Sequence, residues 1–199
     1  MKKWREVLVI AIFIVLAGLY AWQKWPVEIY DTTYNTSATY PSLTGTDTLS
    51  QEFTVYHNGL CGIQIRLVLS GRTDFDPYTW TVATKNGEVV ASGIIDPNEA
   101  DYKGDYKILF DNRLSDSKGM TYVFTIAADQ VSTEDKSLTC YQSVAEKGAG
   151  TVTYNGEAQE GSLMLKGIEK YFDVETFIMG FCLLLYLAFF IRFMSKLFS

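Results

Sequence analysis

The chain has 199 residues, of which 48% are hydrophobic and 20% are charged, and its formal net charge is −6 at pH 7. That length allows one well-buried domain of ordinary size. The acidic balance argues against nucleic acid and against an anionic lipid surface as partners, because both carry negative charge themselves.

Two uncharged apolar runs lie near the ends of the chain, at Val7–Trp22 and Phe177–Ile191. Crossing the hydrocarbon core of a bilayer takes roughly 20 residues, and about 17 at the short limit. Both runs reach that length once their flanks are included. We therefore expect transmembrane anchors at residues 1–25 and 171–199.

Each apolar run has an alternative interpretation that is not a membrane anchor. A charged segment precedes the first run, as in a cleaved signal peptide, but the run is longer than usual and ends in bulky Tyr20, Trp22 and Trp25. Retention as an anchor is the favoured interpretation. The second run could be a buried helix, but it is apolar on every face and is followed by Arg192 and Lys196, which favours a membrane helix.

Basic residues orient both anchors. Each run has them on the side nearer its end of the chain: Lys2, Lys3 and Arg5 precede the first run, and Arg192 and Lys196 follow the second. Positive residues stay on the cytoplasmic side, so we expect a two-pass membrane protein with both termini in the cytoplasm. Residues 23–175, with 12 Lys and Arg against 22 Asp and Glu, then form an acidic extracytoplasmic region of net charge −10.

The region between the anchors begins with residues 26–50, which have little periodicity and predict an extended linker, with pairing to the sheet as an option near Ile29 and Tyr30. Residues 51–170 predict a β domain. Its longest strand is expected at Cys61–Ser70, where apolar and mostly polar residues alternate with a period of two. Asn86-Gly87 predicts a tight hairpin turn.

Further short strands are expected at Leu49–Tyr56, Tyr78–Thr84, Val89–Ile95, Tyr106–Phe110, Thr121–Ala127, Ser137–Ser143, Thr151–Tyr154 and Ser162–Leu165. Asp111–Met120 is expected to be a loop. Many short strands separated by turns predict an all-β antiparallel sandwich or barrel.

The residues form no pattern typical of an enzyme. His57 is the only histidine and lies beside a turn, where a solvated side chain is the common outcome. It excludes a metal cluster built on several histidines and makes any Ser-His-Asp triad depend on one residue. No Gly-rich phosphate loop or Gly-x-Ser-x-Gly motif is present. We expect no catalytic activity.

Asp74 and Asp76 are two carboxylates in a loop between strands. Such a pair can bind Ca²⁺ together with backbone carbonyls, or flank a glycosidic bond. A solvated turn, in which the Asp side chains accept from backbone amides, is the favoured alternative. No cofactor is expected apart from that structural calcium ion. Asp111-Asn-Arg is interpreted as a turn.

Four aromatic residues, Tyr78, Trp80, Tyr102 and Tyr106, lie in or beside loops that could meet at one edge of the domain. Aromatic rings beside carboxylates and amides are typical of sugar-binding sites, which makes these four the candidate glycan site. Core packing is the alternative for Trp80, and packing or an interface for the tyrosines.

Cys61 and Cys140 both fall in the extracytoplasmic region, where a disulfide is chemically permitted. Two buried free thiols are the alternative, since sequence does not show whether the two Cα atoms come within bridging distance. Cys182 lies in the second membrane run, where a packing role is expected.

The stretch from Phe53 to Ala128 resembles a known family in its order of features. The carrying motifs are Phe53-Thr-Val, Gly59-Leu-Cys-Gly-Ile-Gln-Ile-Arg-Leu, Gly71-Arg, Trp80-Thr-Val, Asn86-Gly-Glu-Val-Val, Ile108-Leu-Phe, Asp116-Ser-Lys-Gly and Tyr122-Val-Phe-Thr-Ile. They resemble the extracytoplasmic, jelly-roll-like β-sandwich of bacterial membrane proteins for surface-polysaccharide assembly, which is similar in shape to carbohydrate-binding modules.

Some members of that family are multi-pass, lipid-linked-sugar glycosyltransferases, whereas this chain has only two predicted membrane helices and no room for such a catalytic body. The resemblance implies a non-catalytic accessory protein of the bacterial plasma membrane. Its sandwich would bind glycan, or a membrane glycosyltransferase or export partner, in cell-envelope polysaccharide assembly. The alternative is a structural or signalling subunit whose sandwich makes only protein–protein contacts.

Overall fold

The structure is a computed structural model that describes residues 2–29, 38–72, 74–128, 134–143 and 150–198. The chain divides into two compact units, and each is described by itself. One unit combines Met1–Lys24 with Lys170–Ser199, and the other is Trp25–Glu169.

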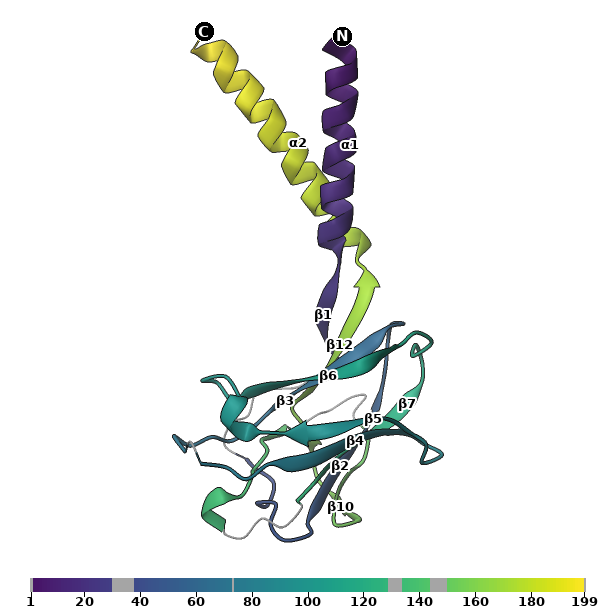
Figure 1. Cartoon of the computed structure of the whole chain (residues 1–199), viewed down its shortest axis with the longest axis vertical. Coiled ribbons are helices and arrows are strands. Elements are labelled where there is room, and N and C mark those ends of the chain that lie inside the picture. Colours follow the sequence, from purple (N-terminus) through teal and green to yellow (C-terminus); the bar gives the residue numbers. More distant parts are fainter. Residues whose placement is uncertain (1, 30–37, 73, 129–133, 144–149, 199) are drawn as a thin grey trace. The chain divides into compact units, whose positions relative to one another are not determined.

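The first unit contains the helices α1 (Lys2–Ala21) and α2 (Val174–Leu197) (Figure 1). The side chain of Asp173 caps α2 by accepting a hydrogen bond from the backbone N–H of Thr176 at 3.0 Å. The 24 residues of α2 rise about 36 Å, which exceeds the roughly 30 Å hydrocarbon core of a bilayer. Because it is also apolar and has no buried residue, α2 is long and apolar enough to cross a membrane.

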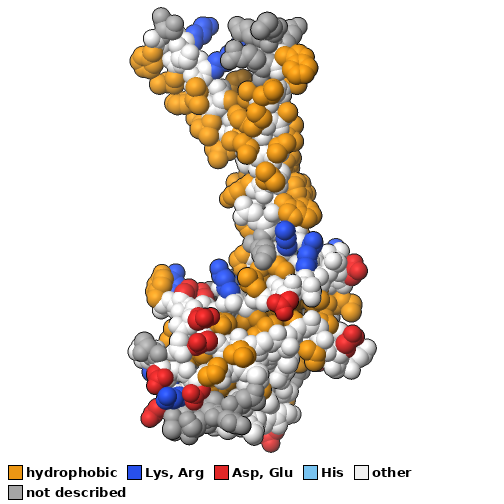
Figure 2. All heavy atoms as spheres, viewed as in Figure 1, with side chains coloured by type: hydrophobic (Ala, Val, Ile, Leu, Met, Phe, Trp, Pro, Cys, Tyr) orange, Lys and Arg blue, Asp and Glu red, His pale blue; other side chains and the backbone are white. Residues whose placement is uncertain are grey.

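The helix α1 has a shorter uncharged part, Val7–Ala21, which rises only about 22 Å. Ala17 and Ala21 are buried, and a Cβ added at Gly180 of α2 would lie 3.9 Å from Cβ of Ala17. Small side chains therefore allow the two helices to approach closely. Figure 2 shows hydrophobic side chains gathered over the helices, whereas the charged ones gather over the sandwich.

The ends of α1 differ from the sequence-based expectation. The helix ends at Ala21, and Trp22 already belongs to the strand β1 (Trp22–Glu28). Trp22 and Trp25 are therefore strand residues and do not lengthen the helix.

The second unit is a sandwich of two antiparallel sheets (Figure 1). The larger sheet has the strand order β10 (Glu157–Gln159), β9 (Val152–Tyr154), β2 (Thr48–Thr54), β7 (Thr121–Ala127), β4 (Tyr78–Thr84), β5 (Val89–Ile95). The smaller has the order β1, β12 (Leu165–Phe172), β3 (Leu60–Arg66), β6 (Asp105–Leu114). The remaining elements are a ribbon of β8 (Gln142–Ser143) with β11 (Ser162–Leu163) and the 3₁₀ turns η1 (Pro97–Glu99) and η2 (Glu134–Lys136).

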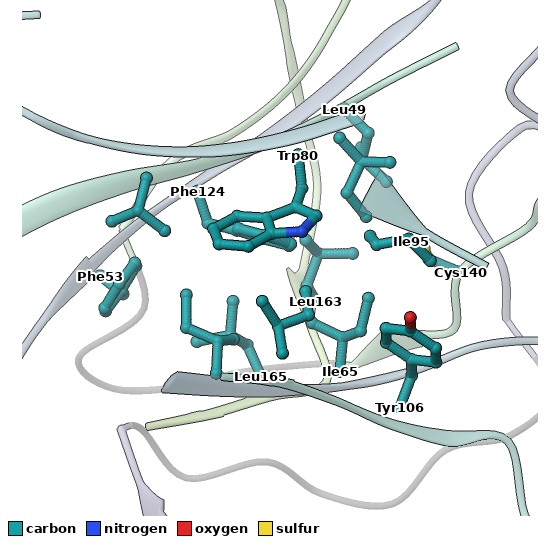
Figure 3. Close-up of a cluster of buried hydrophobic side chains, with 14 of the residues drawn as sticks. Leu49, Phe53, Ile65, Trp80, Ile95, Tyr106, Phe124, Cys140, Leu163 and Leu165 are labelled. Carbon is teal, nitrogen blue, oxygen red and sulfur yellow. The ribbon is translucent and has the colours of Figure 1, made fainter. Parts of the chain in front are cut away.

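The core lies between the two sheets. Every second residue of β2 and β7 is buried, as the period of two requires for strands with one face in a core. Figure 3 shows Leu49, Trp80 and Phe124 of the larger sheet facing Ile65 and Leu165 of the smaller one. The expected all-β sandwich is confirmed.

Part of the expected linker, residues 26–50, packs into the sandwich. Ile29, Tyr40 and Leu43 are buried in its core, and Leu43 bridges to Leu138. Residues 30–37 lie outside the described part of the chain. The described part of the expected linker therefore contributes core residues, because its sparse apolar side chains meet partners that are distant in sequence.

Candidate functional site

Three of the four predicted aromatic site residues lie in the core. Tyr78 and Tyr106 are buried, and Trp80 is 5% exposed and stacks on Phe110, with ring centroids 5.8 Å apart. Only Tyr102 reaches solvent, with an exposed fraction of 89%. The structure does not bring these four together as an open aromatic surface.

The hydroxyl groups of the two buried tyrosines explain their positions. The Tyr78 hydroxyl donates to the carbonyl of Leu43 at 2.9 Å and accepts from the N–H of Leu138 at 2.6 Å. The Tyr106 hydroxyl accepts from the N–H of Asp96 at 3.2 Å. Burial raises the pKa of Tyr78 to about 12. Both side chains satisfy their polar atoms inside the fold, so they are structural residues here.

Asp74 and Asp76, the predicted calcium ligands, have different surroundings. Asp74 is exposed, and its Oδ2 lies 3.1 Å from Nζ of Lys136. Oδ2 of Asp76 is buried without a hydrogen-bond partner. Within the described ranges no three His, Cys, Asp or Glu side chains come together as metal ligands. Lys136 takes the place beside Asp74 that a cation would need, and a calcium site stays a prediction.

Cys61 and Cys140 are both buried and are not joined by a disulfide. Sγ of Cys61 lies 3.2 Å from the carbonyl oxygen of Ile168. Cys140 bridges to Leu67, which is six residues beyond Cys61 along an extended segment, or about 20 Å at the usual rise of a strand. A disulfide needs Cα atoms within about 7 Å, so the structure has the alternative arrangement of two thiols.

His57 lies beside a turn and is partly exposed, as the sequence suggested, but its ring also contacts an acidic side chain. Its Nδ1 lies 2.8 Å from Oε2 of Glu169, a carboxyl side chain that is completely buried. Ser117 is also buried, and its hydroxyl donates to the carbonyl of His57 and not to the ring. The three residues therefore do not form a Ser-His-acid relay. Their contacts connect the loops that contain His57 and Ser117 to β12.

A surface hollow of about 250 Å³ lies where the two sheets meet along β5 and β6. These are the edge strands of different sheets, and they lie beside each other. Its lining residues come from β4, β5 and β6: Trp80, Val89, Val90, Ala91, Ser92, Leu109, Asp111 and Asn112. Of the residues proposed from sequence for a glycan site, only Trp80 takes part.

Two β-bulges shape this hollow. On β5, Val82 pairs with Ala91 and Ala83 pairs with Val89, so that Val90 is an extra residue. On β6, Leu109 pairs with Gly62 while Leu114 pairs with Leu60, so the four residues 110–113 lie opposite a single residue of β3. Bulges redirect side chains and are frequent beside functional sites.

The bulge on β6 corrects the expectation that Asp111-Asn-Arg is a turn. These residues belong to the strand, and the bulge presents Asp111 and Asn112 to the hollow. The side chains of Asp111, Asn112 and Ser92 make no hydrogen bond or ion pair with any residue that the structure describes. Their polar atoms are therefore available to a ligand.

Gly93 fixes the apolar floor beside the hollow. It pairs with Trp80 across β4 and β5, and a Cβ at this position would lie 2.9 Å from Nε1 of the indole. The absence of a side chain lets the indole lie flat across β5 and reach Phe110 of β6. The largely buried indole thus backs a hollow into which β5 and β6 present the polar side chains of Ser92, Asp111 and Asn112.

Comparison with known proteins adds no relative to these observations: no protein-family model matches the chain, and no curated protein matches it.

Proposed function

We propose that this protein is a non-catalytic accessory protein of the bacterial plasma membrane whose sandwich binds glycan during cell-envelope polysaccharide assembly. Both α1 and α2 would act as anchors, with the termini in the cytoplasm and the sandwich outside. The length of α2, the basic residues at both ends of the chain and the resemblance of residues 53–128 support this proposal.

The main support for a glycan ligand is the hollow between β5 and β6. A sugar ring offers hydroxyl groups at its rim and C–H groups on its faces. The Asp111 carboxylate accepts hydrogen bonds, whereas the Asn112 amide and the Ser92 hydroxyl both donate and accept. Val89 and Leu109 supply apolar contact area beside them.

Anchoring suits a site of this size. A hollow that receives one or two sugar units offers few contacts, so its affinity for a free glycan should be low. Tethering near the membrane raises the effective concentration of lipid-linked sugars and of a membrane glycosyltransferase or exporter that handles them. A weak site would then be sufficient for an accessory role.

A second candidate function is protein binding without any sugar. It is favoured by Val89 on β5 and Leu109 on β6, which both line the hollow and are 56% and 54% exposed. Apolar side chains grouped on a surface mark interaction sites. In this case the sandwich would be a structural or signalling subunit, and its partner would cover the same edge.

The glycan proposal is tested with the full chain in lipid nanodiscs. A glycan array would identify a ligand, and saturation-transfer NMR would then compare the wild type with D111A and D116A. Asp116 is also an exposed Asp, lies on the turn after β6 and is outside the hollow, which makes D116A the matched control. We expect D111A to weaken binding about tenfold or more and D116A to leave it unchanged.

An array without any ligand would remove the support for a sugar site. Pull-down of a membrane partner that V89D or L109D abolishes would then favour the second candidate. The membrane arrangement has its own test: protease added to spheroplasts should cut residues 25–169 and spare both ends of the chain. Protection of that middle region would contradict the proposed topology.

A further inference from the structure

We propose that the hollow between β5 and β6 selects uncharged sugar units and rejects units that carry carboxylate, phosphate or sulfate groups. The inference rests on the proposed glycan function and adds the chemical class of the ligand. It is based on the charges in and around the hollow, on the hydrogen-bonding capacity of its polar side chains, and on the charge of the whole sandwich.

Asp111 is the only charged residue among the eight that line the hollow, and none of them is Lys or Arg. No described residue forms an ion pair or hydrogen bond with its side chain. Among the described residues, no Lys or Arg therefore lies within ion-pair distance of this carboxylate. A ligand with an anionic group would bring a second negative charge next to it.

The hydrogen-bonding capacity of Asp111 points the same way. An ionised carboxylate only accepts hydrogen bonds, so it matches the hydroxyl groups of a neutral sugar, and such charge-assisted bonds are stronger than neutral ones. A uronate or phosphate group presents acceptors and cannot donate to it. Ser92 and Asn112 can donate to an anion, but neither provides the fixed positive charge that anion sites in proteins use.

The charge of the sandwich adds to this local effect. The unit Trp25–Glu169 contains 20 Asp and Glu against 10 Lys and Arg, a net charge of −10. Its field repels polyanions, but salt at physiological strength screens charges beyond about 8 Å. Asp111 should therefore dominate the discrimination at close range. Repulsion between two exposed charges a few ångströms apart corresponds to roughly a five- to tenfold loss of affinity.

The experiment uses the full chain in nanodiscs of zwitterionic lipid with a matched pair of probes. One probe is a neutral hexose tetrasaccharide that the array identifies as a ligand, and the other is the same tetrasaccharide oxidised at C6 to uronic acids. Saturation-transfer NMR compares the wild type, D111N and D116N. We expect the wild type to bind the uronate about five- to tenfold more weakly than the neutral probe.

D111N should reduce this ratio to about twofold or less, because the amide keeps the shape of the side chain and removes its charge. D116N is the control, since it removes one charge from the sandwich outside the hollow and should leave the ratio unchanged. Raising the salt concentration from about 0.05 M to about 0.5 M should also narrow the wild-type ratio. This salt dependence needs no substitution and so tests the inference independently of the variants.

The outcomes separate the two levels of the proposal. Binding of neither probe would remove the glycan function and the inference together. Equal or tighter binding of the uronate by the wild type would overturn the inference and leave the glycan function standing. A ratio that D111N does not change would also overturn it, because the discrimination would then come from a different part of the protein.

Discussion

Glu169 and His57 are 112 residues apart in the sequence, yet Oε2 of the glutamate lies 2.8 Å from Nδ1 of the histidine. The glutamate side chain is completely buried, whereas that of His57 is 43% exposed. Burial raises the pKa of Glu169 above its ordinary value, although the contact with His57 lowers it. The loss of hydration therefore destabilises the ionised carboxylate by more than the contact with His57 stabilises it.

The buried Glu169 predicts that the free energy of unfolding depends on pH, and E169Q should remove this dependence. The folded protein holds the Glu169 proton more tightly than the unfolded chain does. The contribution of this group to stability is therefore complete below the unfolded pKa, near 4.5, and is lost as the pH rises through the higher folded pKa. Glutamine has no such proton. Urea unfolding of the full chain in detergent, at several pH values from about 4 to 8, should show a decline in the wild type that E169Q lacks.

Removal of the histidine side chain should lower the free energy of unfolding more than E169Q does. H57A leaves the buried carboxylate without its closest partner, which should lower the free energy of unfolding at pH 7 by about 1–3 kcal/mol. H57N can still donate from its amide and should recover part of the loss. The same urea titration measures both variants, and an H57A protein as stable as the wild type would show that the contact contributes nothing.

Local sequence patterns predicted the hairpins of the fold well. The expected strands Tyr78–Thr84, Val89–Ile95 and Thr121–Ala127 coincide with β4, β5 and β7. Alternation and the Asn86-Gly87 turn are sufficient for them, because both act within a few residues. The pairing of Leu43 with Leu138 and of Leu67 with Cys140 depends on contacts between distant segments, and no local pattern contains that information.

The candidate site was harder to predict for the same reason. Trp80 was selected for its aromatic ring, and it does border the hollow, but Asp111 and Asn112 were interpreted as a turn. Their orientation comes from a bulge, which is a property of the register between β6 and β3. Glu169 offered no signal either, since one acidic residue in a strand is usually on the solvent face.

Asp47 predicts a loss of stability in acid. Its Oδ2 accepts from the N–H of Thr44 at 2.9 Å and from the hydroxyl of Tyr154 at 2.8 Å, and its Oδ1 accepts from the amide of Asn155 at 2.8 Å. These bonds, with that of Asn155 first, lower its pKa to about 2. The stabilisation is therefore complete above the ordinary pKa of 3.8 and is lost as the pH falls through about 2.

D47N should reduce the loss of stability at low pH, because an amide does not titrate there. It should also lower the free energy of unfolding at pH 7 by about 1–2 kcal/mol. Intrinsic tryptophan fluorescence of the full chain during acid and urea titrations measures both effects. D116N is a suitable control, since Asp116 makes no side-chain hydrogen bond with the described residues. An acid limb in D47N as steep as that of the wild type would assign the pH dependence to other carboxyl groups.

Gly104 and Gly45 separate backbone strain from steric collision. Both have positive φ, +82° and +57°, but a Cβ at Gly104 would collide with the carbonyl oxygen of Leu67, whereas a Cβ at Gly45 would meet nothing within 4 Å. G45A should cost about 1–2 kcal/mol from the left-handed backbone alone. G104A should cost about 1–3 kcal/mol more, because its methyl group meets backbone that cannot move aside. Equal unfolding free energies for the two variants would show that the Leu67 segment yields.

The separation of Cys61 and Cys140 predicts that both thiols persist in an oxidising compartment. With about 20 Å between them along β3 and its continuation, no rotation of either side chain brings the sulfur atoms into contact. Intact-mass spectrometry of non-reduced protein should therefore show no loss of two hydrogen masses.

Burial also raises the pKa of Cys140 to about 12, so the reactive thiolate is scarce and maleimide should label Cys140 only after unfolding. A C182S background removes the exposed thiol of α2 from the measurement. Rapid labelling of Cys140 in the folded protein, or a mass indicating a disulfide, would contradict this arrangement of two buried, separated thiols.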